Sequence, residues 1–254
     1  MSLSYSVITI ARNAGSTIAD TLESVLSQTP PPSQYLLIDG GSEDGTLARI
    51  DAARRRAPAD TAVVVQAQAA CAPGAAGIPS AWNQALRQAT GDIIFILNAD
   101  DWYEPDAARR VLAAFAAAPD TDVVVTPIHY RQAPGGAVLR CQRPRRLRWL
   151  PLLMPLPHPG CFVRRSLYDR LGLYDERYAV SADYDFVYRA ARAGAVFTTL
   201  DEAVVSMRPG GFARQRLSLA RRETFAIARR HGAGLVAGLV APGAAFLARW
   251  LLNR

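Results

Sequence analysis

The chain has 254 residues, half of them hydrophobic and a fifth charged, so it is an ordinary globular protein with room for one large α/β domain or two small ones. Its net charge of +7 comes entirely from arginine, since lysine is absent, and either anionic partners or an arginine-rich coding bias accounts for the excess. The three cysteines are scattered and lack metal-type spacing, which argues against a disulfide framework and for a reducing compartment. The N-terminus resembles a strand more than a signal peptide, so a cytoplasmic location is expected.

The first part of the chain alternates between β-type and helical patterns. Ile18, Leu22, Val25 and Leu26 recur at helical spacing, for example, between two β-rich runs. The expected strands cover residues 5–10, 35–38, 63–65 and 93–97, and the expected helices begin near residues 18 and 47 and cover residues 82–89. This alternation predicts a mostly parallel, doubly wound sheet with helices on its faces.

Polar segments follow the first two strands. The first strand ends at Arg12 and Asn13, and Asp39 opens the run D-G-G-S-E-D-G-T after the second. Glycines at a strand-to-helix turn let the backbone approach a ligand closely. This run is therefore a candidate ligand-binding turn.

Acidic residues follow the strand expected at residues 93–97. Asn98, Asp100 and Asp101 follow it, at the edge where open α/β sheets bind their ligands. Adjacent carboxylates repel each other unless a cation compensates them, and a divalent metal that bridges to a diphosphate would do so. The alternative is that the pair caps the next helix, with Pro105 in its first turn.

The second half of the chain is less regular. A helix is expected from Ala107 to Phe115, a strand at residues 123–125 and a hairpin turn at Gly135-Gly136. Arginines between residues 140 and 148 then precede an apolar, proline-broken stretch that reaches Pro157. This segment either contacts a membrane or a lipid-bearing acceptor, or is a loop with its arginines in water.

A second acidic cluster, A-D-Y-D-F-V-Y-R, begins at Ala182. Asp183 and Asp185 lie at the expected start of a helix, where the helix dipole favours negative charge. That structural role would explain the cluster by itself.

Several motifs together resemble the family 2 glycosyltransferases, bacterial enzymes of the GT-A fold. They are V-I-T-I-A-R-N, T-L-E-S-V-L-S-Q-T, Y-L-L-I-D-G-G-S-E-D-G-T, A-T-G-D-I-I-F-I-L-N-A-D-D, L-G-L-Y-D-E-R-Y and A-D-Y-D, in this order. The resemblance covers roughly the first 210 residues. It implies an α/β fold of the GT-A type, Rossmann-like, over residues 1–211, followed by a C-terminal helical extension over residues 212–254.

The resemblance also implies site residues on the donor side. Asp39 matches the position that contacts the nucleotide base, and Asp100 the carboxylate near the ribose. Asp101 matches the residue that reaches a Mn²⁺ or Mg²⁺ ion on the diphosphate. The donor-side residues implied in this way are Ala11, Arg12, Asn13, Asp39, Asn83 and Asp100.

On the acceptor side the resemblance implies Asp183 as the general base. His158, Asp185, Gly210 and Gly211 are placed on the same side. A metal neutralises the leaving diphosphate and one carboxylate takes the proton of the acceptor hydroxyl, so a single displacement with inversion is expected. The implied partners are a nucleotide-diphospho-sugar donor and a saccharide or lipid-linked saccharide acceptor, as in envelope polysaccharide biosynthesis; nucleic acid is not expected.

Two departures from the family pattern concern the donor sugar. Many relatives carry an acidic residue before G-I-Y-D-A-M-N-K-G, but here both expected aspartates are replaced, by Ala75 and Ser80. The metal and base positions are intact, which favours a working hexosyltransferase. A non-catalytic sugar-nucleotide-binding protein and a nucleotidyltransferase remain the alternatives, although the latter usually has a glycine- and lysine-rich loop.

The C-terminal extension combines an arginine-rich helix with an apolar segment at residues 235–252. A spanning helix needs about 20 consecutive apolar residues, so Pro242 and Arg249 make this segment marginal. It is expected to pack on the domain or on a second subunit of a homodimer. Peripheral contact with the cytoplasmic face of a membrane is the alternative.

Overall fold

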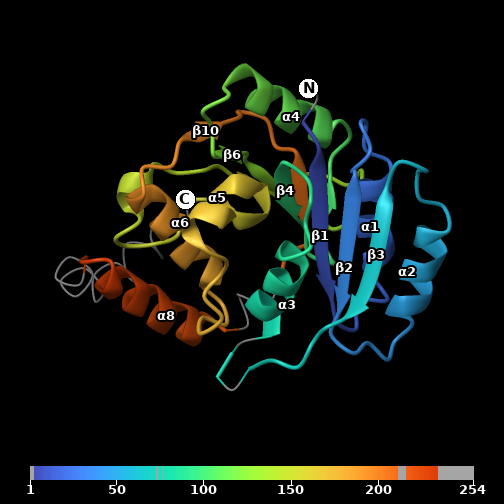
Figure 1. The fold of residues 1–254 in the computed structure, drawn as a ribbon, viewed down its shortest axis with the longest axis horizontal. Coiled ribbons are helices and arrows are strands. Elements are labelled where there is room, and N and C mark those ends of the chain that lie inside the picture. The colour runs from blue at the N-terminus through green and yellow to red at the C-terminus, as the bar shows by residue number, and fades with distance from the viewer. Residues whose placement is uncertain (1–2, 73, 76, 211–215, 234–254) are drawn as a thin grey trace.

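The computed structural model describes residues 3–72, 74–75, 77–210 and 216–233, and Figure 1 shows their arrangement. The strands are β1 (Tyr5–Ala11), β2 (Gln34–Asp39), β3 (Ala62–Ala67), β4 (Ile93–Ile96), β5 (Trp102–Tyr103), β6 (Val123–Val125), β7 (Ile128–Tyr130), β8 (Arg140–Gln142), β9 (Cys161–Arg164), β10 (Phe197–Thr199) and β11 (Val205–Met207). The helices are α1 (Ile18–Leu26), α2 (Thr46–Arg54), α3 (Gly77–Leu86), α4 (Ala107–Ala117), α5 (Arg165–Leu171), α6 (Ala182–Arg192) and α8 (Leu217–Arg230), with short 3-10 turns η1 (Leu147–Trp149) and η2 (His158–Gly160).

The main sheet has the strand order β10-β6-β9-β4-β1-β2-β3. Neighbouring strands are parallel except at β9, which runs antiparallel to both β4 and β6. The mostly parallel sheet predicted from the sequence is therefore confirmed, and so are the predicted strands near residues 5, 35, 63 and 93. The helix expected at 82–89 begins earlier, at Gly77.

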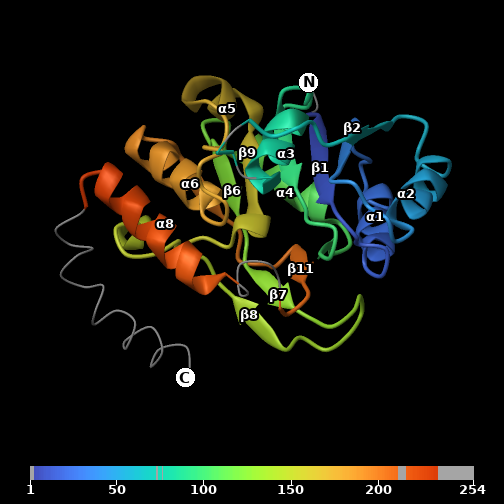
Figure 2. The ribbon, with the colours of Figure 1, turned by 90° about the horizontal axis from the view of Figure 1, so that it is seen from below.

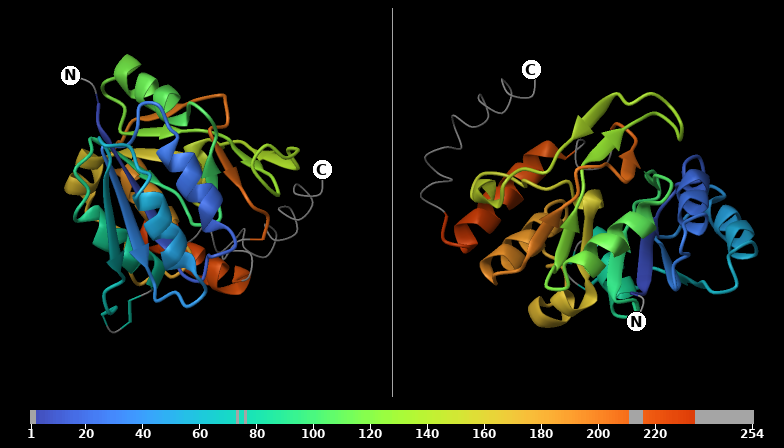
Figure 3. Two further views of the ribbon diagram at one scale, coloured as in Figure 1. Left: turned by 90° about the vertical axis from the view of Figure 1, so that its right-hand side faces the viewer. Right: turned by 90° about the horizontal axis from the view of Figure 1, so that it is seen from above.

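Both faces of the main sheet are covered, which explains the apolar run of β4. Ile94 and Ile96 join the core beneath α3, α5 and α6, whereas Ile93 and Phe95 join the core beneath α1, α2 and α4. Successive side chains of a strand point to opposite faces, so a strand buried on both faces must be apolar throughout. Helices on both sides of the sheet are visible in Figures 1 and 3.

A smaller sheet has the order β5-β11-β7-β8 (Figure 2). β7 and β8 form the predicted antiparallel hairpin, and Gly135 in its turn has a φ of +72°, a backbone conformation that glycine tolerates best. The sequence did not indicate β5, β9 or β11, because strands this short carry little periodicity. The small sheet lies near the carboxyl end of β4, because its strand β5 follows β4 closely in the chain.

Helix α8, the described part of the C-terminal extension, packs on α6. Its Glu223 accepts hydrogen bonds of 2.8, 2.9 and 2.8 Å from the backbone N–H groups of Ala179, Val180 and Ser181, just before α6. Ile227 is buried in the same core as α6. The predicted domain boundary at residue 211 and the apolar segment 235–252 lie outside the described residues. Within the described residues no helix is long and apolar enough to cross a bilayer.

Candidate active site

The predicted site residues gather at one edge of the main sheet. The parallel strands β1, β2 and β4 all end there, at Ala11, Asp39 and Ile96. β9 is antiparallel to β4, with Ile94 opposite Val163, so η2 and His158 precede β9 at this same edge. Segments far apart in the sequence therefore converge where the sheet topology exposes strand ends.

Asp39 ends β2 with one carboxylate oxygen engaged and the other unpaired. Its Oδ2 accepts hydrogen bonds from the N–H groups of Gly41 (3.0 Å) and Ser42 (2.9 Å), which fixes the side chain. Its Oδ1 is buried and has no partner within the described residues. A buried polar atom without a partner costs free energy, so this oxygen is suited to accept a hydrogen bond from a ligand.

The turn after β1 is tied to the turn after β2. The N–H of Asn13 donates to Ser42 Oγ at 2.9 Å, and the Asn13 side chain accepts from the N–H of Glu43 at 2.9 Å. Asn13 has a φ of +51°, and Arg12 beside it is exposed. Ala11 is buried, and its carbonyl accepts from the N–H of Gly40 at 2.8 Å. These hydrogen bonds connect the turn after β1 to the turn after β2, beside Asp39.

We predict that Asp39→Ala weakens nucleotide binding. If the free oxygen accepts a hydrogen bond from the base, its loss should cost about 1.5–3 kcal/mol, the usual range for a bond to a charged group. Calorimetric titration with nucleoside diphosphates measures this directly. Asp60→Ala is the matched control, because Asp60 lies before β3 rather than after a strand end. A loss below twofold for Asp39→Ala would remove Asp39 from the site.

The acidic pair after β4 is not a helix cap. β5 intervenes, and α4 begins only at Ala107, with Asp106 before it. Asp101 is fully buried, with Oδ2 accepting a 3.2 Å hydrogen bond from Asn98 Nδ2 and Oδ1 without a partner in the described residues. Burial, with the charge of Asp100 added, raises the pKa of Asp101 well above its usual value. Burial also raises the pKa of the partly exposed Asp100.

Arg208, after β11, fastens this acidic loop. Its guanidinium donates to the carbonyl of Asp100 at 2.6 Å and pairs with Asp20 on α1. It also lies over the ring of Trp102, 4.9 Å from the ring centroid. The positive charge lowers the pKa of Asp100, against the larger effect of burial. The sequence analysis missed Arg208, because nothing local distinguishes it from other arginines.

The acidic pair suits a divalent cation. Two adjacent carboxylates with raised pKa values and one unpaired buried oxygen would be stabilised by a cation. The described residues contain no cluster of three or more potential ligands, so a cation here would take most of its oxygens from a diphosphate and water. That is the coordination expected of Mg²⁺ or Mn²⁺ bound with a nucleotide.

Asp183 opens α6 near His158. Its Oδ1 accepts a 2.8 Å hydrogen bond from the N–H of Tyr184. Burial raises the pKa of Asp183, and the nearby His158 opposes this shift. Burial lowers the pKa of His158 and so favours its neutral form, although the charge of Asp183 opposes this shift. A carboxylate with a raised pKa is a stronger base than a solvated one.

An aromatic cluster surrounds the His158 imidazole. The ring of Trp82 on α3 lies 5.0 Å from His158 and 5.1 Å from Tyr174, and His158 Nε2 is 3.2 Å from the Tyr174 hydroxyl. Trp82 Nε1 is buried without a partner within the described residues. Asp183 lies close enough to this cluster that its charge affects the pKa values of His158 and Tyr174. Trp82 begins the helix expected at residues 82–89, but the sequence analysis assigned it no role in the site.

Asp185, which the sequence analysis assigned to the acceptor side, has its carboxylate bonded to other side chains. It is fully buried, with Oδ2 at 2.8 Å from Arg189 Nε and Oδ1 at 3.3 Å from His231 Nε2. Residues two apart on a helix point about 200° away from each other, so Asp183 and Asp185 face different neighbours. Asp185 joins α6 to α8.

We predict that Asp185→Asn destabilises the fold without removing turnover. Weakening the charged hydrogen bonds should cost about 2 kcal/mol and lower the unfolding midpoint by roughly 4–8 °C. Thermal unfolding combined with turnover per folded molecule checks this. Normal stability with abolished turnover would return Asp185 to the catalytic site.

The structure also shows the surroundings of two other predicted site residues, Asn83 and Gly210. Asn83 is buried and fastens α3 to the segment before α6. Its Nδ2 donates to the Tyr174 carbonyl (2.9 Å) and Glu176 Oε1 (2.8 Å), and its Oδ1 accepts from the Tyr174 N–H (3.0 Å). These bonds use both amide hydrogens of Asn83, so its contact with the sugar-nucleotide donor stays a prediction. Gly210 is exposed with a φ of +107°, and Gly211 lies outside the described residues.

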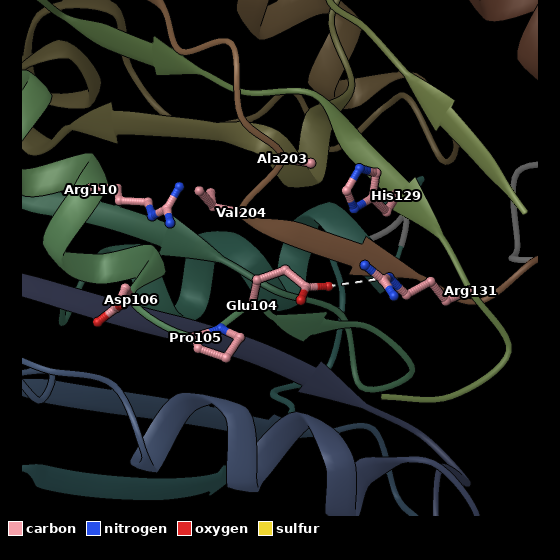
Figure 4. A pocket seen from close by; sticks show the side chains of 8 residues that line it. All are labelled: Glu104, Pro105, Asp106, Arg110, His129, Arg131, Ala203 and Val204. Carbon is pink, nitrogen blue, oxygen red and sulfur yellow. Dashed lines mark ion pairs between the residues drawn. The ribbon is translucent and has the colours of Figure 1, made fainter. Parts of the chain in front are cut away.

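A pocket of about 280 Å³ lies elsewhere, between the start of α4 and the small sheet (Figure 4). Glu104 and Arg131 face each other across it, 3.5 Å apart, and His129 of β7 adds a partly buried imidazole. None of the predicted site residues lines it. The predicted site residues lie instead at the strand ends of the main sheet.

The sheet is mostly parallel, an acidic pair follows β4, and the buried carboxylate of Asp39 lies at the same edge. This arrangement is that of a glycosyltransferase of the GT-A type. The chain belongs to glycosyl transferase family 2, whose family model matches residues 6–172. A "PGL/p-HBAD biosynthesis glycosyltransferase" of Mycobacterium bovis is 30% identical over 207 residues, which are 80% of this chain and 75% of that protein.

Two solved structures share the fold. The 1–349 portion of S. aureus TarS in complex with UDP-GlcNAc has a TM-score of 0.67 at 20% identity, with 90% of this chain and 65% of that chain covered. The mannosyltransferase PcManGT from Pyrobaculum calidifontis, in complex with GDP-Man and Mn²⁺, has a TM-score of 0.62 at 17% identity, with 100% and 81% covered. The chain spans 39% of the longer TarS chain. These structures show the fold, whereas the family model and the mycobacterial relative identify this protein as a glycosyltransferase.

Proposed function

We propose that this glycosyltransferase transfers a hexosyl group, with inversion, from a nucleotide-diphospho-sugar to a hydroxyl of a saccharide or lipid-linked saccharide. The observation that carries the proposal is a partly buried Asp183 with a raised pKa at the same sheet edge as the acidic pair. Donor phosphates and acceptor hydroxyl would meet between these two groups.

The donor nucleotide would lie along the strand ends of β1 and β2. The unpaired Asp39 Oδ1 is suited to accept a hydrogen bond from the nucleotide base. The hydrogen bond from Asn13 to Ser42 holds the turn beside it. Arg12 is exposed at this edge and offers a guanidinium to an anionic donor.

Asp100 and Asp101 would hold a divalent cation. When bound, such an ion neutralises the charge that grows on the leaving diphosphate. Arg208 keeps the acidic loop in place through the Asp100 carbonyl and Asp20. The Mn²⁺ in the PcManGT complex supports metal use in this fold.

Asp183 would take the proton of the acceptor hydroxyl. Asp185, the other carboxylate of the cluster, is engaged by Arg189 and His231, so one base serves this side. A single carboxylate fits direct displacement and inversion, whereas retention through a covalent intermediate needs a nucleophilic carboxylate close to the sugar.

The experiment is a donor panel scored by nucleoside diphosphate release. UDP-GlcNAc and GDP-Man, the donors named for the related structures, head the panel, each with Mn²⁺, Mg²⁺ or chelator. We expect slow, metal-dependent hydrolysis of at least one donor. When a saccharide acceptor is added, NMR of the glycoside formed should show an inverted anomeric centre. Donor binding without any release would instead support the non-catalytic alternative.

A further inference from the structure

Helix α8 carries a one-sided arginine face. Arg221, Arg222 and Arg229 are exposed, and Phe225 between them is 41% exposed. The one acidic residue of the helix, Glu223, is turned inward and bonded to backbone N–H groups before α6. We call Arg221, Arg222, Phe225 and Arg229 the arginine face.

The arginine face follows from helical spacing. Arg222, Phe225 and Arg229 are three and four residues apart and so form one stripe, while Ile227 and Ala228 point into the core. The three arginines have no ion-pair partner within the described residues, whereas Arg230 on the flank pairs with Asp175 at 2.9 Å. Like charges crowded on one stripe repel each other until an anionic partner compensates them.

A second basic segment lies at the same end of the molecule. Arg143, Arg145, Arg146 and Arg148 are exposed, and Trp149 beside them is 40% exposed. The Tyr184 hydroxyl of α6 donates to the Leu150 carbonyl and so anchors this segment next to the helix on which α8 packs. Figures 1 and 2 show α8 and this segment at the end opposite α2.

The sequence beyond the arginine face is apolar. Residues 235–252 follow α8 closely, contain no acidic residue and are mostly alanine, leucine, valine and glycine. Basic side chains interleaved with exposed aromatic ones, next to an apolar segment, match the chemistry of a bilayer surface. A nucleic acid or an acidic protein would use the arginines but not the apolar residues.

We propose that the arginine face and the segment 143–149 dock this protein on a bilayer surface that carries anionic phospholipid. The arginines would contact the headgroups, and Phe225 and Trp149 would enter the interface beside them. The proposal concerns a surface away from the sheet edge and stands independently of the donor and acceptor proposed above.

The test is co-sedimentation of the full chain with vesicles of phosphatidylcholine alone or with phosphatidylglycerol added. We expect binding only to the anionic vesicles, weakening as salt is raised. The triple variant Arg221→Glu, Arg222→Glu, Arg229→Glu should lose binding by roughly 100-fold, since each arginine near an anionic surface contributes about fivefold. Phe225→Ala should lower it separately.

The matched control reverses the same number of charges on exposed arginines in α2 or directly after it, at the opposite end of the molecule: Arg49→Glu, Arg54→Glu and Arg55→Glu. Its vesicle binding should stay within about threefold of wild type, the share expected from long-range charge alone at moderate salt. Circular dichroism confirms that each variant folds. The proposal would be overturned by equal losses in both triple variants or by unchanged binding in the α8 variant. It would also be overturned if Phe225→Ala had no effect and a soluble polyanion competed fully for binding.

Discussion

Asp183→Asn should lower turnover by about 10²- to 10⁴-fold while donor binding stays unchanged. The variant keeps the size of the side chain and its hydrogen bond from the Tyr184 N–H, but removes the lone pair that takes the proton. Nucleotide affinity by calorimetry and single-turnover transfer separate the two effects. If Asp183→Asn turns over normally, or loses affinity as much as turnover, it is not the base.

The pH dependence provides a second readout for Asp183. Burial raises its pKa, so the basic, ionised form appears only at higher pH than for a solvated aspartate. The acidic limb of the kcat/KM profile should therefore lie above pH 4, since an unperturbed aspartate titrates near 3.9. The variant Asp183→Asn should lose this limb. A limb that stays in place in Asp183→Asn would show that Asp183 is not the titrating group.

Asp101→Asn should lower metal-dependent nucleotide binding by at least about 100-fold, because even residues that only orient a metal ligand cost about 10- to 100-fold when they are replaced. The side-chain amide of asparagine has no anionic oxygen, whereas Oδ1 of Asp101 is anionic and has no partner within the described residues. Titration of nucleoside diphosphate with Mn²⁺ and with chelator measures the effect. Asp100→Asn should show a loss of the same kind.

The matched control for the acidic pair is Asp106→Asn, an acidic residue a few positions further along the chain and paired with Arg109 at 2.8 Å. It should bind nucleotide and metal like wild type. In Asp101→Asn, metal should also no longer raise the unfolding temperature in the presence of nucleotide, since a ligand stabilises only the state that binds it. Metal-dependent affinity that survives in both Asp100→Asn and Asp101→Asn would place the cation elsewhere.

The sequence by itself determined the layout of the sheet edge. β4 had to be buried on both faces because its residues are apolar without alternation, and the side chains after it, Asn98 to Asp101, had to lie at the ligand-binding edge because parallel strands end together. The same reasoning correctly located Asp39 at the end of β2. These features depend on local pattern and on topology, both of which a sequence carries.

Only the tertiary structure decided which polar side chains are free to meet a ligand. Asp183 and Asp185 share one motif, yet Arg189 and His231 engage Asp185, and the partners of Asn83 come from a segment more than ninety positions along the chain. The short strands β5, β9 and β11 likewise take their place from neighbouring strands rather than from their own residues. Hydrogen-bond partners and short strands are set by contacts between distant segments, and these contacts leave no periodic trace in the sequence.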